Sequence, residues 1–547
     1  MSRRLGAGIA GAAVLIGVIT ILARVTGFAK QLVFARAVGT NCLSTAYYTA
    51  NQVPNIIFEL VVGGALAGMV VPVLAGAAVR QTADARAEVG RISSALLTWV
   101  LVLLVPLGLL TALLAGPAMR LLTSGVRDCD PGAVAAVAAR MLVAFAPQIP
   151  LYGVAVVLYG VLQAHRRFTG PAVAPLVSSV VVIVAYLAFV PLSAGNSDPA
   201  SVPGPAEIAL SVGTTLGVLA LVLTVIGPTS RLGVRWRPTL RFPDGVAVQV
   251  RRLALAGLSA LVAQQAAMAI VIPLANNDVG GGALAAYNYA WAIYQVPYAV
   301  LAVPIATSAF PVLSARAQDA DRASFAALSA QTTRAVLVVS GLAAGALAAV
   351  AAPVAQVFLG QADTRIPPEQ FASAVALFAP GLIGYGLMAH LSRVLYASGR
   401  GRAAARGMVI GWLVVIVAQV AFVRTFPADW KLGGLALGQA AGMTAGGAIL
   451  LASVFRDRGV EALHGVPRAA LAAVVGGGAG VLAGLGVVHV LGGSGLWAGI
   501  AVAALSGVCA VCVGTLAAAA VDRRDLLAVV SRLRGRRSDE PDPAEIA

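Results

Sequence analysis

Three cations in an apolar stretch near the N-terminus are the residues best suited to bind a ligand. Arg24, Lys30 and Arg36 belong to a predicted membrane span at 7–37. A charge inside the hydrocarbon costs roughly 3 to 17 kcal/mol unless it reaches the surface or meets a partner. We therefore expect these cations to line a polar cavity and to bind an anionic group. Snorkelling of one or two of them to the membrane edge is the alternative.

On a straight helix these three side chains point in different directions, because successive residues are rotated by about 100°. They converge on one ligand only if the helix bends. Gly27 is the candidate hinge, since kinks commonly occur at glycine. Two prolines inside later spans, Pro54 and Pro297, are further hinge candidates.

A second predicted span, at 46–79, adds polar residues to this set. Glu59 is well inside the span, and pairing with Arg24 or Lys30 is its expected role; proton coupling is the alternative. Asn51 and Gln52 are candidate cavity-lining residues, as is Gln295 in a later span. Side chains of this kind also hydrogen-bond between helices, which is the simpler interpretation.

The composition is that of a helical membrane protein. Of 547 residues, 59% are hydrophobic and 11% are charged, whereas a soluble domain has roughly a quarter of its residues charged. The net charge of +16 does not indicate nucleic-acid binding, because the basic residues are scattered between apolar runs and form no continuous patch. Short basic loops of this kind set membrane orientation and contact anionic lipids.

Apolar runs long enough to cross a bilayer predict an all-α polytopic fold with about fourteen transmembrane helices. With the N-terminus inside, most Lys and Arg fall in inside loops, which places both termini in the cytoplasm. The predicted outside loops hold only Arg120, Arg127, Arg365, Arg424 and Lys431. The predicted spans are 7–37, 46–79, 92–116, 132–162, 171–192, 206–227, 247–275, 283–315, 325–358, 370–397, 404–424, 433–454, 468–490 and 495–520.

An internal repeat predicts two lobes. Phe145-Ala146-Pro147 recurs as Phe378-Ala379-Pro380, and Tyr152-Gly153 recurs at the same offset as Tyr385-Gly386. The copies are an even number of spans apart, so they share one orientation. This indicates two pseudo-symmetric six-helix lobes related by an axis along the membrane normal. The predicted parts are an N-lobe at 1–227, a basic cytoplasmic linker at 228–246, a C-lobe at 247–460, an additional pair of helices at 461–521 and a cytoplasmic tail at 522–547.

Catalytic and cofactor motifs are missing from the sequence. It has no phosphate-binding Gly-rich loop followed by Lys and Ser or Thr, and no Cys and His spacing suited to a metal. We expect no enzyme activity and no cofactor, and we expect His390 to be a packed residue inside a span. Cys42 and Cys129 both fall in predicted outside loops; a disulfide is possible there, but the sequence alone favours two free thiols.

The N-terminal motif resembles that of the MurJ/MviN lipid II flippases of the multidrug/oligosaccharidyl-lipid/polysaccharide exporter superfamily. The resemblance rests on Arg24-Val25-Thr26-Gly27-Phe28-Ala29-Lys30 with Arg36, then Pro54-Asn55 and Pro72-Val73-Leu74. Two six-helix lobes with an extra pair of helices also match that family. The match is imperfect, because Lys30 stands where Arg is common. Three positions that carry charges in relatives fall here on Phe58, Thr45 and Ala292.

The resemblance implies that Arg24 and Lys30, with Arg36, bind the pyrophosphate of a lipid-linked precursor in a central cavity. The substrate would be lipid II, the undecaprenyl-pyrophosphate-linked muropeptide, carried by alternating access across the bacterial cytoplasmic membrane. Anionic membrane lipids and cell-wall synthesis or division proteins are the other expected partners. The alternatives are export of another polyprenyl-linked glycan, or a scaffold for cell-wall synthesis that transports nothing.

Overall fold

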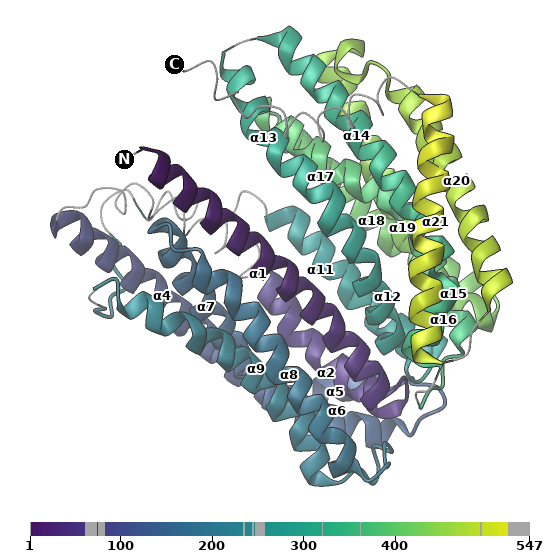
Figure 1. Ribbon diagram of the computed structural model, residues 1–547. Coiled ribbons are helices and arrows are strands. Elements are labelled where there is room, and N and C mark those ends of the chain that lie inside the picture. Colours follow the sequence, from purple (N-terminus) through teal and green to yellow (C-terminus); the bar gives the residue numbers. More distant parts are fainter. Residues whose placement is uncertain are drawn as a thin grey trace. The chain divides into compact units, whose positions relative to one another are not determined.

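The computed structural model describes residues 2–60, 70, 74, 83–233, 236–242, 246, 258–319, 321–360, 363–492 and 495–522, with side chains from residue 18 onward and not for 83–86. Across these residues the regular structure is helical, apart from one isolated bridge between Thr40 and Thr364 (Figure 1). The all-α fold class is confirmed.

In the described residues, thirteen helical stretches are long and apolar enough to cross a membrane. Each coincides with one predicted span. The predicted span at 46–79 is the one without a counterpart, because it runs into residues 61–69, which lie outside the described part. Thirteen of the fourteen predicted spans therefore have a counterpart in the described residues, and the span at 46–79 stays a prediction.

The chain divides into two compact units, which we describe separately. Unit 1 comprises Met1–Tyr289 and Gln361–Pro367, and unit 2 comprises Ala290–Gly360 and Pro368–Ala547. The boundary falls inside a helix and not in the linker at 228–246. The lobes predicted from the repeat, at 1–227 and 247–460, stay a prediction, because the relation between the two halves is not determined.

Unit 1 holds the first nine described helices and the first part of the tenth. The helices are α1 (Ser2–Ala37), α2 (Cys42–Phe58), α4 (Ala83–Leu113), α5 (Ala115–Thr123), α6 (Pro131–Phe145), α7 (Gln148–Ala164), α8 (Thr169–Ser193), α9 (Gly204–Ser230), α11 (Leu258–Pro273) with the π-helix Leu274–Val279, and the start of α12 (Ala283–Pro297).

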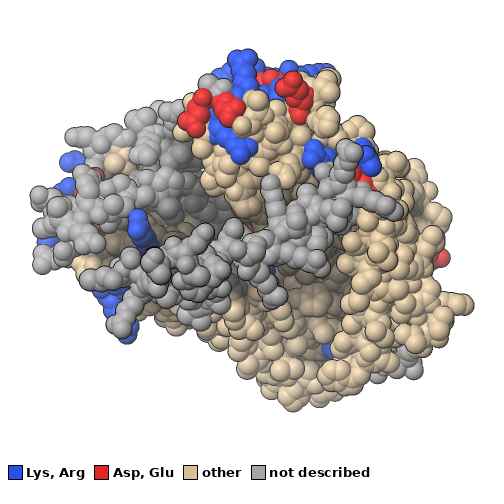
Figure 2. Space-filling model, turned by 45° about the horizontal axis from the view of Figure 1, so that its top comes forward, with Lys and Arg blue, Asp and Glu red and all other residues tan. Residues whose placement is uncertain are grey.

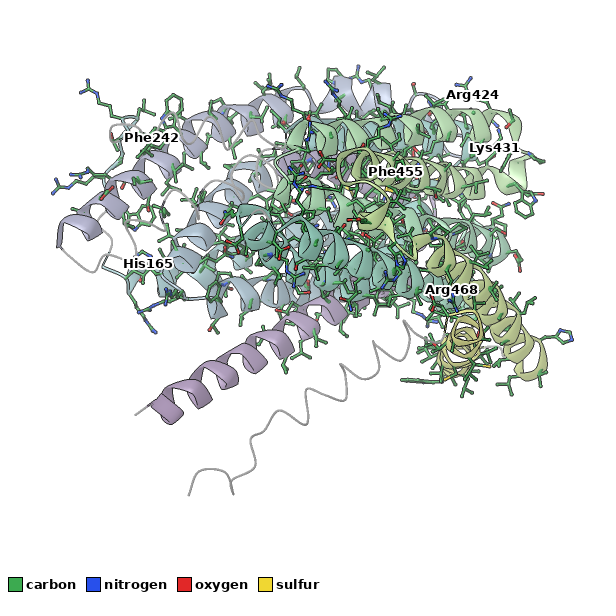
Figure 3. All side chains as sticks on the ribbon, turned by 90° about the horizontal axis from the view of Figure 1, so that it is seen from above. His165, Phe242, Arg424, Lys431, Phe455 and Arg468 are labelled. Carbon is green, nitrogen blue, oxygen red and sulfur yellow. A yellow bond between two sulfur atoms is a disulfide. The ribbon has the colours of Figure 1, made fainter. Side chains whose placement is uncertain are left out.

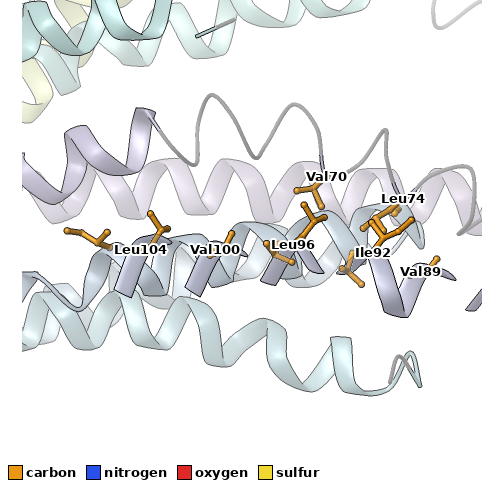
Figure 4. Close-up of a cluster of buried hydrophobic side chains, with 11 residues drawn as sticks. Val70, Leu74, Val89, Ile92, Leu96, Val100 and Leu104 are labelled. Atoms are coloured by element: carbon orange, nitrogen blue, oxygen red, sulfur yellow. The ribbon is translucent and has the colours of Figure 1, made fainter. Parts of the chain in front are cut away.

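One face of α4 shows how unit 1 is packed. Val89, Ile92, Leu96, Val100 and Leu104 recur every three or four residues, so they share one side of the helix. That side is buried (Figure 4). The linker docks on the same helix, because the Arg237 amide donates to Ser94 Oγ at 3.0 Å and the Trp99 indole donates to the Leu240 carbonyl at 3.0 Å. The described part of the linker therefore packs against unit 1.

Unit 2 continues α12 through the π-helix Tyr298–Ala302. Its helices are α13 (Val303–Gln318), α14 (Arg322–Ala349), α15 (Ala351–Leu359), α16 (Pro368–Phe378), α17 (Gly381–Ala397), α18 (Gly401–Thr425), α19 (Lys431–Arg458), α20 (Val466–Leu491) and α21 (Leu496–Val521).

The additional helices α20 and α21 pack on α14 through small residues (Figure 1). A Cβ added at Gly341 of α14 would lie 2.6 Å from Cβ of Ala473, and one added at Gly345 would lie 2.4 Å from the carbonyl oxygen of Gly477. Such spacing brings two helix backbones close together, which is the usual way in which helices associate where apolar burial gives no driving force. The pair at 461–521 is thus a packed part of unit 2.

Much of the described surface is apolar. Leu and Val side chains are exposed along α4, α8, α20 and α21, among them Leu113, Val184, Leu482 and Leu516. On the face shown in Figure 2, acidic and basic side chains gather mainly in one region and most of the other described surface is uncharged. Exposed apolar helix faces of this length fit a lipid environment.

Candidate functional site

The α1 cations lie on one long helix that is helical from Ser2 to Ala37 without a break. Arg24 is exposed, while Lys30 and Arg36 are half-buried. Their spacing of six residues rotates each by about 240° from the one before, so the structure does not bring all three to one face. A Cβ added at Gly27 would meet nothing within 4 Å. Packing therefore does not require glycine at this position, and its role as a hinge stays a prediction.

Arg24 shares its part of α1 with apolar side chains that are also exposed. Ile21 is 65% exposed and Val25 is 58% exposed. Further along, α1 becomes buried, and Phe34 and Ala35 are fully covered. Lys30 lies at this transition. The helix thus carries Arg24 on an exposed apolar surface and Lys30 where the helix becomes buried against its neighbours.

An aromatic cluster that the sequence did not indicate holds the buried end of α1. Phe34 lies 4.6 Å from Tyr47 and 4.9 Å from Tyr186, measured between ring centres. The Tyr47 hydroxyl is hydrogen-bonded to the Tyr186 hydroxyl at 2.6 Å, and the Tyr48 hydroxyl donates to the Gln31 side-chain oxygen at 2.7 Å. Because Gln31 follows Lys30 directly, the cluster fixes the helix next to this cation.

Glu59 is the acidic residue expected to pair with a cation of α1. It is half-buried one turn after Pro54, and among the described residues no ion pair joins it to Arg24 or Lys30. Arg24 and Glu59 come from different helices, and the sequence contains no information on their separation. The pairing of Glu59 with Arg24 or Lys30 therefore stays a prediction.

The candidate polar residues lie close to prolines that interrupt regular helix. Asn51, Gln52 and Gln295 are half-buried, within a few residues of Pro54 or Pro297. Residues 298–302 after Pro297 form a π-helix, and a π-helical turn begins at Glu59 after Pro54. Proline removes one helical hydrogen bond, and widened turns of this kind are frequent at functional positions. Both prolines thus stay hinge candidates, now with a local irregularity beside each.

Each unit contains an aromatic contact made by the repeated tyrosine. In unit 1 Tyr152 lies 4.3 Å from Phe58, and in unit 2 its repeat counterpart Tyr385 lies 3.8 Å from Tyr298, between ring centres. In each case the tyrosine packs on an aromatic residue that follows a hinge-candidate proline: Phe58 follows Pro54 by four residues, and Tyr298 follows Pro297 directly. A similar aromatic contact of the repeated tyrosine thus occurs in both units.

Arg393 is a cation inside a membrane-grade helix that sequence reasoning did not single out. It belongs to the apolar stretch Pro368–Ala397, is half-buried, and donates to the Ala389 carbonyl of its own helix. His390, one turn earlier, is fully buried with Nε2 3.0 Å from Thr332 Oγ1. The packed role expected for His390 agrees with this burial. In the part of the chain that the structure describes, no group of three His, Cys, Asp or Glu residues could hold a metal ion.

At one end of unit 1, segments from five predicted outside loops meet. Cys42 and Cys129 form a disulfide, so the expectation of two free thiols is wrong. The side chains of Asn41 and Ser197 donate to the Asp363 carboxylate at 2.9 and 2.7 Å. These loops are far apart in sequence, and the pairing of their thiols could not be read from spacing. We call the residues of these five loops that contact one another the loop cluster.

Backbone hydrogen bonds hold the same loops together. The Thr40 amide donates to the Asp363 carbonyl at 3.0 Å, and the Arg365 amide donates to the Thr40 carbonyl at 2.8 Å. A Cβ at Gly39 would lie 1.9 Å from the Asp363 carbonyl oxygen, and φ is +89° there, so glycine is required. Thr45 Oγ1 accepts from the Gly282 amide at 2.7 Å. Five of the loops predicted to share one side of the membrane therefore lie together.

Comparison with known sequences identifies a single family. A profile described as "Lipid II flippase MurJ" matches residues 34–498. The protein named "Lipid II flippase MurJ" from Burkholderia cenocepacia is 28% identical over 383 residues, which are 69% of this chain and 71% of that protein. A "Probable lipid II flippase MurJ" from Synechocystis sp. is 29% identical over 238 residues, 43% of this chain and 42% of the relative.

Solved structures show a similar fold. A lipid II flippase MurJ in an inward closed conformation has a TM-score of 0.67 at 17% sequence identity, covering 91% of this chain and 98% of that one. An inward-facing MATE-family transporter of the MOP superfamily has a TM-score of 0.64 at 17% identity, covering 82% and 98%. These two solved structures thus share the fold of this chain.

Proposed function

Because this chain belongs to the MurJ family of lipid II flippases, we propose that it moves lipid II across the bacterial cytoplasmic membrane. The observation that carries the proposal is the family match over residues 34–498, which takes in most of both units. The protein is a transporter and not an enzyme. The head group passes from the cytoplasmic to the outer leaflet by alternating access, and no covalent bond is made or broken.

Arg24 and Lys30 bind the pyrophosphate in this proposal. They precede the matched residues, so their role rests on their own placement: one cation is exposed on an apolar helix, and the next is half-buried beside the aromatic cluster. A cation held in such surroundings gains most from a doubly charged anion, because little water competes for it. Arg36 lies nearer the loop cluster and is a weaker candidate for the same contact.

The disulfide supports the orientation. Disulfides persist outside the cytoplasm and are rare within it, so the end of unit 1 with Cys42 and Cys129 belongs on the outer side. In the proposed orientation, both chain termini lie in the cytoplasm. The basic inside loops then face the anionic inner leaflet, where they attract acidic lipids, and they are available to cell-wall synthesis or division proteins.

A flipping assay in vesicles tests the proposal, with complementation of a flippase-depleted bacterium alongside. We expect the wild-type chain to translocate lipid II and to restore growth. The double variant Arg24→Ala, Lys30→Ala should remain in the membrane at normal abundance and lose most transport. Arg120→Ala is the matched control, since it removes an exposed cation elsewhere in unit 1.

Failure of the wild-type chain in both assays would reject lipid II as the substrate and favour another polyprenyl-linked glycan or a scaffold role. Full transport by the double variant would keep the function and reject the two cations as the pyrophosphate site.

A further inference from the structure

A pocket of about 360 Å³ opens at one end of unit 2, away from the α1 cations. Its walls come from the last turns of α13, α17 and α19 and from the turn after α17. The residues that matter are Ser314, Gln318, Tyr396, Ser398, Gly399 and Arg458. No Asp or Glu is among the described lining residues, and most of the lining is polar. The pocket is thus suited neither to a metal cation nor to an apolar ligand.

The pocket lies at the membrane surface on the predicted cytoplasmic side. Two apolar helical stretches, Ala283–Gln318 and Pro368–Ala397, end at its rim. It joins residues in or next to three predicted inside loops, which lie between α13 and α14, between α17 and α18, and after α19. Phe455, in the last turn of α19, marks this end of the helix in Figure 3. On the predicted topology, a group bound here would lie near the phosphates of the inner leaflet.

Arg458 supplies a cation whose position is fixed by two contacts. Its guanidinium lies 4.6 Å from the centre of the Phe325 ring, and its Nε lies 3.2 Å from Asp457. Asp457 also accepts from Arg400 at 2.7 Å, so one carboxylate is shared by two guanidinium groups and a net positive charge remains. The side chain of Arg458 is only 23% exposed. A partly desolvated arginine binds an anion more strongly than one in open water.

Several hydrogen-bond donors in the same pocket are left without a partner in the part of the protein that the structure describes. Within the described residues, the hydroxyls of Ser314 and Tyr396, the side-chain amide of Gln318 and the terminal nitrogens of Arg458 make no hydrogen bond. Arg393 lies three residues before Tyr396, on the same side of α17, and adds a second positive charge behind the pocket. Several unengaged donors around one fixed guanidinium match an oxyanion with several acceptor oxygens.

We propose that this pocket binds a phosphate group, supplied either by a membrane lipid head group or by a soluble phosphate compound. The site is separate from the pyrophosphate contact proposed for α1, and its existence does not depend on which lipid is transported. Arg458 makes the charged contact, and the hydroxyls of Ser314 and Tyr396 and the amide of Gln318 donate to the remaining oxygens. The open turn at Gly399, where a Cβ would meet nothing within 4 Å, leaves room for the rest of the ligand.

Binding to the purified full-length protein tests the proposal in two arms. One arm titrates inorganic phosphate and pyrophosphate in neutral detergent and follows the melting temperature. The other uses nanodiscs of phosphatidylcholine with or without phosphatidylglycerol, and it measures phosphatidylglycerol retained by the protein. Saturable binding in either arm supports the phosphate site, and the arm that responds identifies the source.

Three variants locate the site. Arg458→Gln should weaken binding about 10- to 100-fold, since it removes a charge-assisted contact. Arg456→Gln, an exposed residue of the same helix, should have no effect. Tyr396→Phe removes only a hydroxyl and should weaken binding about 3- to 10-fold, and it decides the outcome if Arg458→Gln fails to fold. Absence of saturable binding in both arms, or equal affinity of the Arg458→Gln and Arg456→Gln proteins, would overturn the proposal.

Discussion

Individual side chains divide into those that the sequence predicts and those that only the fold indicates. Arg24 and Lys30 could be found from the sequence because a cation in an apolar run is costly and therefore informative. Arg393 carries the same signal, but it lies near the end of its span, where it resembles the many basic residues of the loops. The unused donors of Ser314 and Gln318 have no signal at all, because a hydroxyl or amide in a helix becomes a binding group only when other helices surround it.

Substitution of Arg24 should impair transport without harming insertion. Removing a charge from an apolar helix makes insertion easier, while loss of a charge-assisted contact costs about 1.5–3 kcal/mol. We expect Arg24→Ala to lower the flipping rate by roughly one to two decades at unchanged membrane abundance. Arg24→Lys should recover part of it, since a point charge lacks the two-pronged guanidinium contact.

Two variants of Lys30 compare the loss of a positive charge near the pyrophosphate with the addition of a negative one. Lys30→Glu should reduce flipping more than Lys30→Ala, because it places a negative charge near the pyrophosphate. Equal rates for the two variants, measured at matched abundance, would show that Lys30 does not contact the anion.

Among the helices, periodicity and length predicted every span that the structure describes, since a bilayer leaves few other ways to bury backbone groups. The breaks inside spans were not predicted. Pro54 and Pro297 are visible in the sequence, but the widened turns beside them depend on how neighbouring helices pack. The contacts of the loop cluster, and the pairing of Cys42 with Cys129, likewise require loops that are distant in sequence to meet.

The irregular segment after Pro297 should matter for motion more than for stability. Pro297→Ala restores a helical hydrogen bond, so we expect a melting temperature equal to or above that of the wild type and a several-fold slower flipping rate. Pro175→Ala, at an exposed position inside the regular helix α8, is the control and should flip normally. If both variants flip at the wild-type rate, the π-helical segment is not a hinge.

Reduction of the disulfide should destabilise unit 1. Cys42 and Cys129 are 87 residues apart, and closing a long loop typically contributes about 2–4 kcal/mol. We expect Cys42→Ser to lower the melting temperature by several degrees. Cys512→Ser, which removes an exposed free thiol, should leave it unchanged. A Cys42→Ser protein that melts with the wild type would mean that the hydrogen bonds of Thr40 and Asp363 hold the loop cluster alone.

At the scale of the molecule, alternation of basic loops predicted which loops share a side, and the structure agrees within each unit. The loop cluster collects predicted outside loops, while the pocket of unit 2 collects predicted inside loops. Arg424 and Lys431, two of the few cations in predicted outside loops, lie close together near the end of α18 and at the start of α19 (Figure 3). The number of basic residues in each loop indicates the side of the membrane on which the loop lies. It does not indicate how one repeat is rotated relative to the other.

Thiol labelling in intact cells checks the orientation. In a protein whose free cysteines Cys509 and Cys512 are replaced by serine, Asp198→Cys should react with a membrane-impermeant maleimide. Glu461→Cys should react only after the cells are permeabilised. Both positions are exposed in the structure, so a difference reports sidedness and not burial. Labelling of Glu461→Cys in intact cells would reverse the assignment.

The Cys42–Cys129 bond also keeps a record of biogenesis. One thiol follows α1 and the other precedes α6. In the proposed orientation, the two can be oxidised together only after both connecting loops have crossed the membrane. A chain that inserts its early helices upside down, or skips one, leaves at least one thiol in a reducing compartment. In that orientation, the fraction of reduced protein in newly made membranes reports insertion errors in the first part of the chain.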